Sequence, residues 1–191
     1  MIKRFLELEK RIVKPYGLKR FIWRLFGRIG HAFFRFYPPE VISSSGKKLL
    51  NLGAGPSLQK DFVNADFYRL HHLLKRKSAN WMLDITKPLK CKDNYWDGVY
   101  LSHVNEHITF SDNYKLLTEI LRVMKPKATL RLVIPDLDTY LNWNEIRKSE
   151  PKMNRYKSLP EAISNLAQNH EHISIWNFDL MEEVLLNVGF I

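Results

Sequence analysis

The spacing of hydrophobic and polar residues changes its period repeatedly from residue 48 onward. Short apolar runs predict strands at 48–52, 62–67, 81–83, 98–101 and 129–134. Apolar residues at every third or fourth position predict helices at 114–124, 159–168 and 179–188. Strands that alternate with helices are typical of a mostly parallel sheet covered on both faces. The pattern therefore predicts an α/β fold with about five strands.

The first 45 residues have a different pattern. Residues 18–36 predict a helix with leucine, isoleucine and phenylalanine on one face and four arginines on another. A shorter amphipathic segment at 2–13 precedes this helix, and Pro38 and Pro39 end it, because proline disfavours a helical residue before it. A serine-rich linker follows at 43–46. We therefore expect an amphipathic extension over 1–45 and a single core domain over 46–191.

The positive charge of the chain is concentrated in this extension. The net charge of the whole chain is +10. Residues 1–40 hold ten basic residues and only three acidic ones. A basic face opposite a phenylalanine-rich face suits the surface of an anionic membrane, so residues 18–36 are expected to bind one. Packing on the core or in a homo-oligomer is the alternative. Nucleic acid is a weaker alternative partner, because the basic residues lie outside the core domain.

The expected compartment is the cytoplasm, with peripheral attachment to the membrane. Basic residues interrupt every apolar run in the first 40 positions before it reaches the length of a signal peptide or a membrane span. Cys91 is the single cysteine, which excludes an internal disulfide and suits a reducing compartment.

Candidate ligand-binding residues follow the first three predicted strands. Ligands of open parallel sheets bind beyond the carboxyl ends of the strands. The first strand ends in the small residues 53–55, where backbone amides can approach a ligand closely. Asp66 ends the second strand, and Asp84 with Ile85 follows the third. Taken singly, each has an ordinary explanation as a turn residue, but their shared position predicts an adenosine site in which carboxylates accept from ribose hydroxyls and the adenine amino group.

The sequence resembles Rossmann-like S-adenosylmethionine-dependent methyltransferases in five successive blocks: LNLGAG, NADF, LDI, WDGVYLSHVNEHI and LLTEILRVMKPKATLRLVIPDL. The resemblance covers about residues 47–191 and is closest to a small bacterial type associated with cell-surface polysaccharide genes. It implies S-adenosylmethionine as cofactor. It also implies a set of cofactor-binding residues: Leu52, Gly53, Ala54, Gly55, Asp66, Phe67, Asp84, Ile85 and Ser102. A dinucleotide dehydrogenase fits less well, because its G-x-G-x-x-G pattern requires glycine where Leu58 stands.

Two features depart from that family. Pro56 and Ser57 follow the glycine pair where another glycine is common, and about ten residues separate Gly55 from Asp66, which leaves little room for a first helix. The sequence also ends at Ile191, where the family fold continues into a final pair of strands. We expect a five-stranded sheet without that pair, in a truncated chain or with a partner that completes the sheet edge.

Histidines are the candidate catalytic bases. Methyl transfer to a hydroxyl needs an aligned acceptor and a base with a pKa near neutral. The stretch from His172 to Trp176 resembles a segment of the same family, which implies His172 as the first candidate and Trp176 as a pocket wall; His103 and His107 are the alternatives. His103, Glu106 and His107 also spell the H-x-x-E-H motif of inverted zinc peptidases. They follow a buried strand among the cofactor motifs, so no metal is expected.

Together these features predict a methyltransferase that uses S-adenosylmethionine. The expected acceptor is a hydroxyl or similar group of a small molecule, a glycan or a lipid-linked intermediate at the cytoplasmic face of the membrane. The rival hypothesis is a non-catalytic adaptor, or a truncated remnant, that keeps the nucleotide-binding fold.

Overall fold

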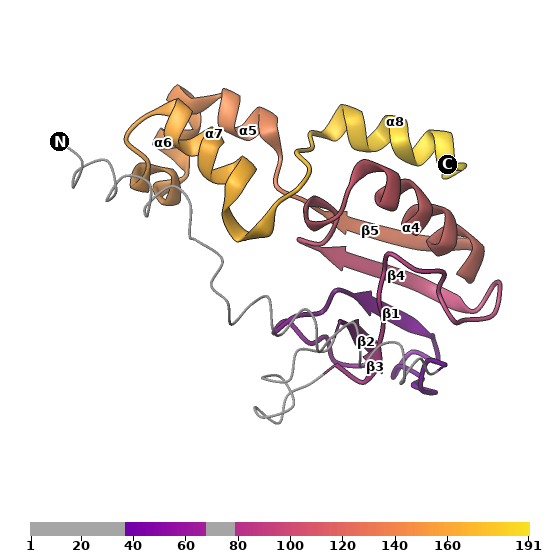
Figure 1. The fold of residues 1–191 in the computed structure, drawn as a ribbon. Helices are drawn as coiled ribbons and strands as arrows, with labels where there is room; N and C mark the ends of the chain where they lie inside the picture. The colour runs from indigo at the N-terminus through magenta and orange to yellow at the C-terminus, as the bar shows by residue number, and fades with distance from the viewer. Residues whose placement is uncertain (1–36, 68–78) are drawn as a thin grey trace, which may run out of the picture.

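The computed structural model describes residues 37–67 and 79–191 (Figure 1). The predicted helix at 18–36 and the segment at 2–13 lie outside these residues. The described part contains a five-stranded sheet made of β1 (Leu49–Leu52), β2 (Val63–Asp66), β3 (Trp81–Met82), β4 (Trp96–Ser102) and β5 (Met124–Val133). Their order is β3-β2-β1-β4-β5, and every neighbouring pair is parallel. The predicted α/β class, strand number and parallel arrangement are confirmed.

The main core lies between this sheet and helix α4 (Phe110–Val123). Leu50, Leu52 and Leu101 of the central strands are completely buried. The α4 face that meets them presents Leu117 and Ile120, which are also completely buried. Helix α8 (Phe178–Val188) packs on α4 (Figure 1). Apolar burial of this kind supplies the main driving force that orders the strands and so fixes where they end.

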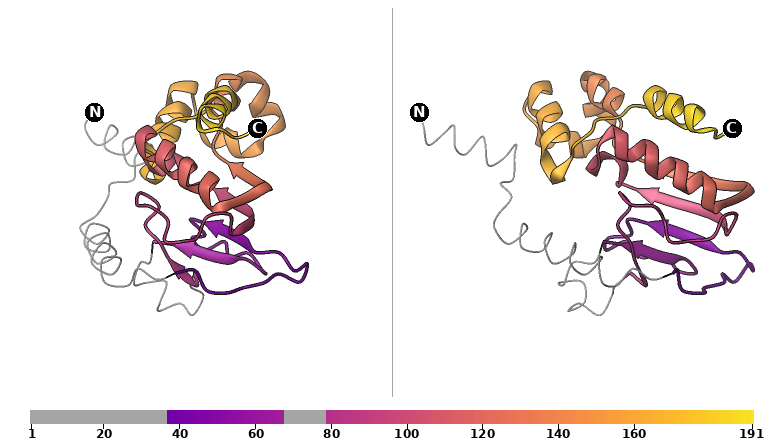
Figure 2. Two further views of the ribbon diagram at one scale, coloured as in Figure 1. Left: turned by 90° about the vertical axis from the view of Figure 1, so that its right-hand side faces the viewer. Right: turned by 45° about the vertical axis from the view of Figure 1, so that its right-hand side comes forward.

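The opposite face of the sheet is described only for part of the chain, so the predicted cover on both faces stays a prediction. No helix among residues 37–67 and 79–191 covers it (Figures 1 and 2). Leu49, Phe62, Tyr100 and Arg131 instead line a shallow hollow there. The loop between β1 and β2 has turns in place of a helix, which agrees with the short spacing between Gly55 and Asp66.

A helical insertion follows β5 and was only partly predicted. It comprises α5 (Leu137–Leu141), α6 (Trp143–Ser149), the short 3₁₀ helix η2 (Pro151–Arg155), α7 (Leu159–Gln168) and the short 3₁₀ helix η3 (Asn169–Glu171). Trp143, Met153, Tyr156 and Ala162 form a small separate core within it. The sequence predicted α7 alone, because α5 and α6 are too short to show a helical period. The insertion lies beyond the carboxyl end of β5 (Figure 2).

No helix in the described part of the chain combines the length and the hydropathy needed to cross a membrane.

Candidate functional site

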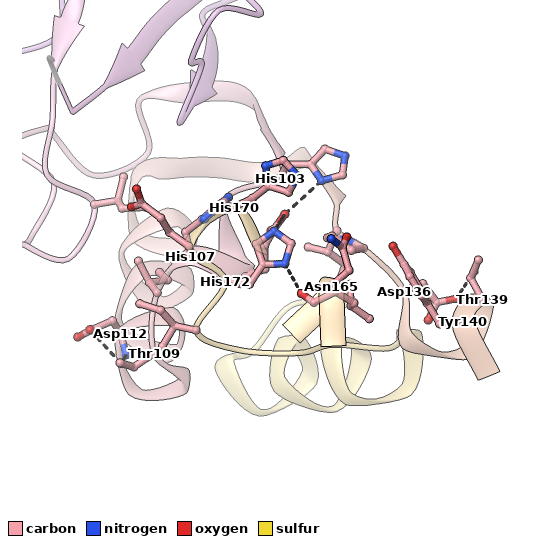
Figure 3. A pocket seen from close by; sticks show the side chains of 18 of the residues that line it. His103, His107, Thr109, Asp112, Asp136, Thr139, Tyr140, Asn165, His170 and His172 are labelled. Atoms are coloured by element: carbon pink, nitrogen blue, oxygen red, sulfur yellow. Dashed lines mark hydrogen bonds and ion pairs between the residues drawn. The ribbon is translucent and has the colours of Figure 1, made fainter. Parts of the chain in front are cut away.

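An open cleft of about 1710 Å³ separates the carboxyl edge of the sheet from the helical insertion. Ligand pockets of proteins commonly enclose roughly 300–1,000 Å³, so this cleft has room for a cofactor and an acceptor together. Figure 3 shows His103, His107, His170 and His172 gathered in one part of the cleft, with Asp136, Thr139 and Tyr140 of the insertion on the other side.

Three of the predicted cofactor residues line this cleft, namely Phe67, Asp84 and Ile85. The remaining six lie at the same edge of the sheet but outside the lining: Leu52, Gly53, Ala54, Gly55, Asp66 and Ser102. Leu52 and Ala54 are buried. A ligand at this edge could therefore meet backbone atoms of these two residues, while their side chains belong to the core.

The glycine turn after β1 is bound to β2. Gly53 and Gly55 have φ angles of 66° and 49°, a region that glycine adopts without the steric cost of a Cβ atom. The amide of Ala54 donates to the carbonyl of Ala65 at 3.0 Å, and the amide of Gly55 donates to Oδ2 of Asp66 at 2.8 Å. We expected the amides of this turn to face a ligand, and for these two that expectation is wrong, because both already donate to β2.

The two predicted carboxylates combine a turn role with exposure at the binding edge. Oδ1 of Asp66 accepts from the amide of Phe67 at 2.6 Å, and Oδ1 of Asp84 accepts from the amide of Thr86 at 3.0 Å and from its hydroxyl at 2.7 Å. A carboxylate has about four acceptor positions, so each can still receive a ligand hydroxyl or amine. With the apolar side chains of Phe67 and Ile85 beside them, these acceptor and packing groups fit the chemistry of an adenosine.

Glu106 stands at the centre of the histidine group. It belongs to the 3₁₀ helix η1 (Asn105–His107) just after β4, and only 2% of its surface is exposed. His103 Nδ1 lies 3.1 Å from Oε1 of Glu106, and His172 Nε2 lies 4.0 Å from the same oxygen. The rings of His107 and His172 meet edge to face with 5.0 Å between their centroids. The structure thus brings all three predicted catalytic histidines together around one buried carboxylate.

Backbone carbonyls orient two of these rings. His172 Nδ1 lies 2.6 Å from the carbonyl oxygen of Leu166, which can only accept, so Nδ1 is the donor of this hydrogen bond. His107 donates to the backbone carbonyl of Glu171. Burial lowers the pKa of His107, so its ring is neutral at neutral pH.

A buried polar network holds η1 in place and was missed in the sequence. Asn113 of α4 donates to the carbonyl of Asn105 at 2.8 Å, and Asn105 donates to Oδ1 of Asn113 at 2.7 Å. Ser174 Oγ lies 3.1 Å from the carbonyl oxygen of Asn105 and accepts from Trp176 Nε1 at 2.8 Å. Trp176 is 1% exposed and lies outside the cleft lining, so its predicted role as a pocket wall is wrong. Its indole ring belongs to the main core.

The segment that carries His172 is bound to η1 by its backbone. The carbonyl of Glu106 accepts from the amides of Ile173 and Ser174 at 2.7 and 3.2 Å. His170 and Glu171, just before His172, have φ angles of 56° and 69°, and His103 has a φ of 56°. Residues other than glycine rarely adopt this conformation. Three positions of the site, two of them consecutive, are therefore held in unfavourable backbone geometry.

Comparisons with known proteins relate part of the sequence and the fold to methyltransferases. The model of a methyltransferase domain matches residues 54–132, which include Asp66, Asp84 and the histidine motif after β4. A structure of a SAM-dependent methyltransferase from Archaeoglobus fulgidus is similar with a TM-score of 0.53 and 18% identity, over 98% of this chain and 74% of that one. The YcgJ protein from Bacillus subtilis is similar with a TM-score of 0.46 and 16% identity, over 87% of this chain and 66% of that one. A search of curated proteins gives no match.

The methyltransferase domain match supports the enzyme class, and the likeness to the Archaeoglobus protein shows the shared fold. The chain is a methyltransferase that uses S-adenosylmethionine, on a Rossmann-like parallel sheet. This agrees with the class that the sequence motifs imply.

Proposed function

We propose that this enzyme transfers a methyl group to a hydroxyl of a glycan or a lipid-linked intermediate. One observation carries the proposal: histidines around the buried carboxylate of Glu106 line the same cleft as Asp84 and Ile85, the expected adenine-binding residues. An oxygen acceptor must lose a proton as it is methylated, whereas a carbon or sulfur acceptor with an acidic proton has less need of such a cluster.

S-adenosylmethionine, when bound, supplies a methyl group on a sulfonium centre that an oxygen nucleophile displaces in line. Asp66 and Asp84 would hold the adenosine part by accepting from its hydroxyl and amino groups. A histidine of the cluster would receive the acceptor proton, with His172 first among His172, His103 and His107 on sequence grounds. Glu106 would stabilise the positive charge that forms on that ring, because opposite charges at short range favour the charged form.

The cleft wall on the insertion side supports a hydroxyl-rich acceptor. Thr139, Tyr140 and Arg155 place polar groups along it. Sugar hydroxyls form hydrogen bonds with such side chains, whereas an entirely apolar acceptor would leave them unpaired at a cost. The basic extension at 1–40 supports a membrane-bound location for that acceptor, since several basic residues near an anionic surface contribute about 1 kcal/mol each.

The proposal can be tested with tritium-labelled S-adenosylmethionine and separated membrane-lipid, glycan, protein and RNA fractions as acceptors. We expect label in a glycan or glycolipid fraction, in an alkali-stable ether. Label in RNA or protein alone would exclude the proposed acceptor. Calorimetry with S-adenosylmethionine excludes the adaptor alternative if binding is measurable, and supports the adaptor if the folded protein does not bind the cofactor at all.

The membrane location is tested separately with vesicles of anionic and neutral lipid. The full chain should bind the anionic vesicles, and replacing Arg20, Arg24 and Arg28 by glutamine should abolish the preference. Equal binding of the parent and the variant to both vesicle types would exclude the charge-based attachment.

A further inference from the structure

Three potential metal ligands converge within the histidine group that holds the candidate bases. Ligand atoms of Glu106, His107 and His172 all lie within 4.8 Å of one another. They come from two segments, η1 and the residue after η3, which the Glu106 carbonyl joins through its bonds to Ile173 and Ser174. The cluster is therefore held by backbone contacts as well as by side-chain packing.

The geometry of this cluster leaves room for a cation. His172 Nδ1 contacts the carbonyl oxygen of Leu166, so Nε2 is the ring nitrogen that faces Oε1 of Glu106, at 4.0 Å. The second carboxylate oxygen of Glu106, Oε2, is buried and has no hydrogen-bond partner within the described part of the chain. Buried polar atoms are normally paired, so this oxygen is an independent sign of an absent partner, which a cation or a hydrogen-bond donor can supply.

The surroundings of the two imidazoles match those of metal-binding histidines. Such rings usually donate their other N–H to a backbone carbonyl or carboxylate, which fixes the tautomer and the direction of the ligand nitrogen. His172 does this to Leu166, and His107 does it to Glu171.

We propose that Glu106, His107 and His172 bind a divalent transition-metal ion at the acceptor end of the cleft. Two imidazoles and one carboxylate are a ligand set used by zinc and by other divalent ions such as manganese and iron. Metal–ligand bonds of about 2.1 Å place tetrahedral ligand atoms about 3.4 Å apart. The three groups thus need to approach by roughly 1 Å, which side-chain rotations can supply.

This site differs from the peptidase motif that the same sequence spells. In H-x-x-E-H peptidases both histidines of the motif bind the ion, whereas here His103 bonds to Glu106 and His172 takes the second imidazole position. This set could not be read from sequence spacing, because His172 lies 65 positions after His107.

The role of the ion rests on the proposed function. A divalent ion with three protein ligands keeps at least one open position, which an acceptor hydroxyl can occupy. The ion lowers the pKa of that hydroxyl. The O–H bond then breaks with its proton going to Nε2 of His103, which lines the cleft, has a side chain 61% exposed and bonds to Glu106 through Nδ1. The oxygen forms its bond to the methyl carbon while the carbon–sulfur bond breaks, and the ion returns unchanged. His172 acts here as a ligand, and His103 acts as the base.

The test uses the full chain without S-adenosylmethionine or acceptor, titrated with Zn²⁺ and Mn²⁺ by calorimetry and with Co²⁺ by visible absorption. We expect one ion per chain and Co²⁺ bands typical of nitrogen and oxygen ligands. His172→Ala and Glu106→Gln should each weaken binding by at least about 100-fold, more than the loss of an outer partner costs. His170→Asn is the matched control, since His170 lies in the same cleft but outside the three ligands and asparagine tolerates its φ of 56°, so this variant should bind like the parent.

Failure of one to one binding for all three ions would overturn the proposal, as would equal binding by the parent and His172→Ala. Should Glu106→Gln fail to fold by circular dichroism, His107→Ala replaces it. The metal and the methyl transfer can be separated: unchanged turnover after chelation overturns the metal site and leaves the function intact. Metal binding without methyl transfer to any hydroxyl overturns the function and leaves the site intact.

Discussion

Oδ2 of Asp66 accepts a hydrogen bond of 2.8 Å from the backbone amide of Gly55, and this bond joins the end of β2 to the turn after β1. The same carboxylate accepts from the amide of Phe67 through its other oxygen. Asp66 therefore shapes the turn and places Phe67 at the cleft, in addition to its expected contact with the ribose.

Replacing Asp66 by alanine should weaken S-adenosylmethionine binding by about 1–3 kcal/mol, since ribose hydroxyls and the Gly55 amide would both lose a charged acceptor. Calorimetry measures the change. Asp61→Asn is the matched control, because Asp61 lies in the same β1–β2 loop at a φ of 66° that asparagine tolerates. Equal affinities for Asp66→Ala and the parent would reduce Asp66 to a turn residue.

Two glycines of the chain allow the cost of steric contact to be measured separately from the cost of backbone strain. A Cβ atom on Gly53 would collide with the side chain of Val104, whereas a Cβ on Gly46 would meet no atom within 4 Å. Both have positive φ angles, 66° and 74°. Gly46→Ala should therefore cost only the strain, about 1 kcal/mol, and Gly53→Ala should cost about 1–3 kcal/mol more for overpacking. Urea denaturation measures both. Equal losses would mean that Val104 moves away freely.

His172→Ala should lower turnover by about 10²- to 10⁴-fold while the affinity for S-adenosylmethionine changes little, because His172 lies away from the adenosine side. Single-turnover kinetics and calorimetry on the same preparation give the two numbers. His170→Ala should retain turnover within a few fold. A His172→Ala enzyme with parental turnover would leave His103 and His107 as the remaining candidates.

Cys91 should react slowly with a disulfide reagent such as DTNB. Burial raises the pKa of its thiol, so at pH 8 the fraction of reactive thiolate is smaller than for a free cysteine, and access is also limited. The reaction should accelerate at least about tenfold in urea and, in the folded protein, as pH rises. Native protein that labels as fast as unfolded protein would show that the segment around Cys91 opens readily.

The strands and the residues at their carboxyl ends were accessible from sequence because both are local signals. Apolar runs marked the five strands, and Asp66 and Asp84 stood where parallel strands end. Among residues 37–67 and 79–191 no helix covers the second face, and the short β1–β2 loop has turns where the alternation of strands and helices implies a helix.

The central role of Glu106 could not be read from its neighbours. Its environment depends on His172 and Ser174, which follow an insertion whose helices α5 and α6 are too short to predict. The same non-local packing sets the orientation of Trp176, whose indole points into the core and donates to Ser174. A sequence pattern names chemistry-bearing residues, but only packing decides which of them face a common space.

The left-handed backbone conformations at His103, His170 and Glu171 imply a conflict between thermal robustness and activity. Each costs on the order of 1–2 kcal/mol relative to a relaxed backbone, against a total folding free energy of about 5–15 kcal/mol for a typical domain. Glycine at position 170 or 171 would recover part of that cost and raise the melting temperature, while loosening the segment that aims His172. Selection for heat resistance alone would therefore favour substitutions at these positions. The same substitutions would be the most prone to lower turnover.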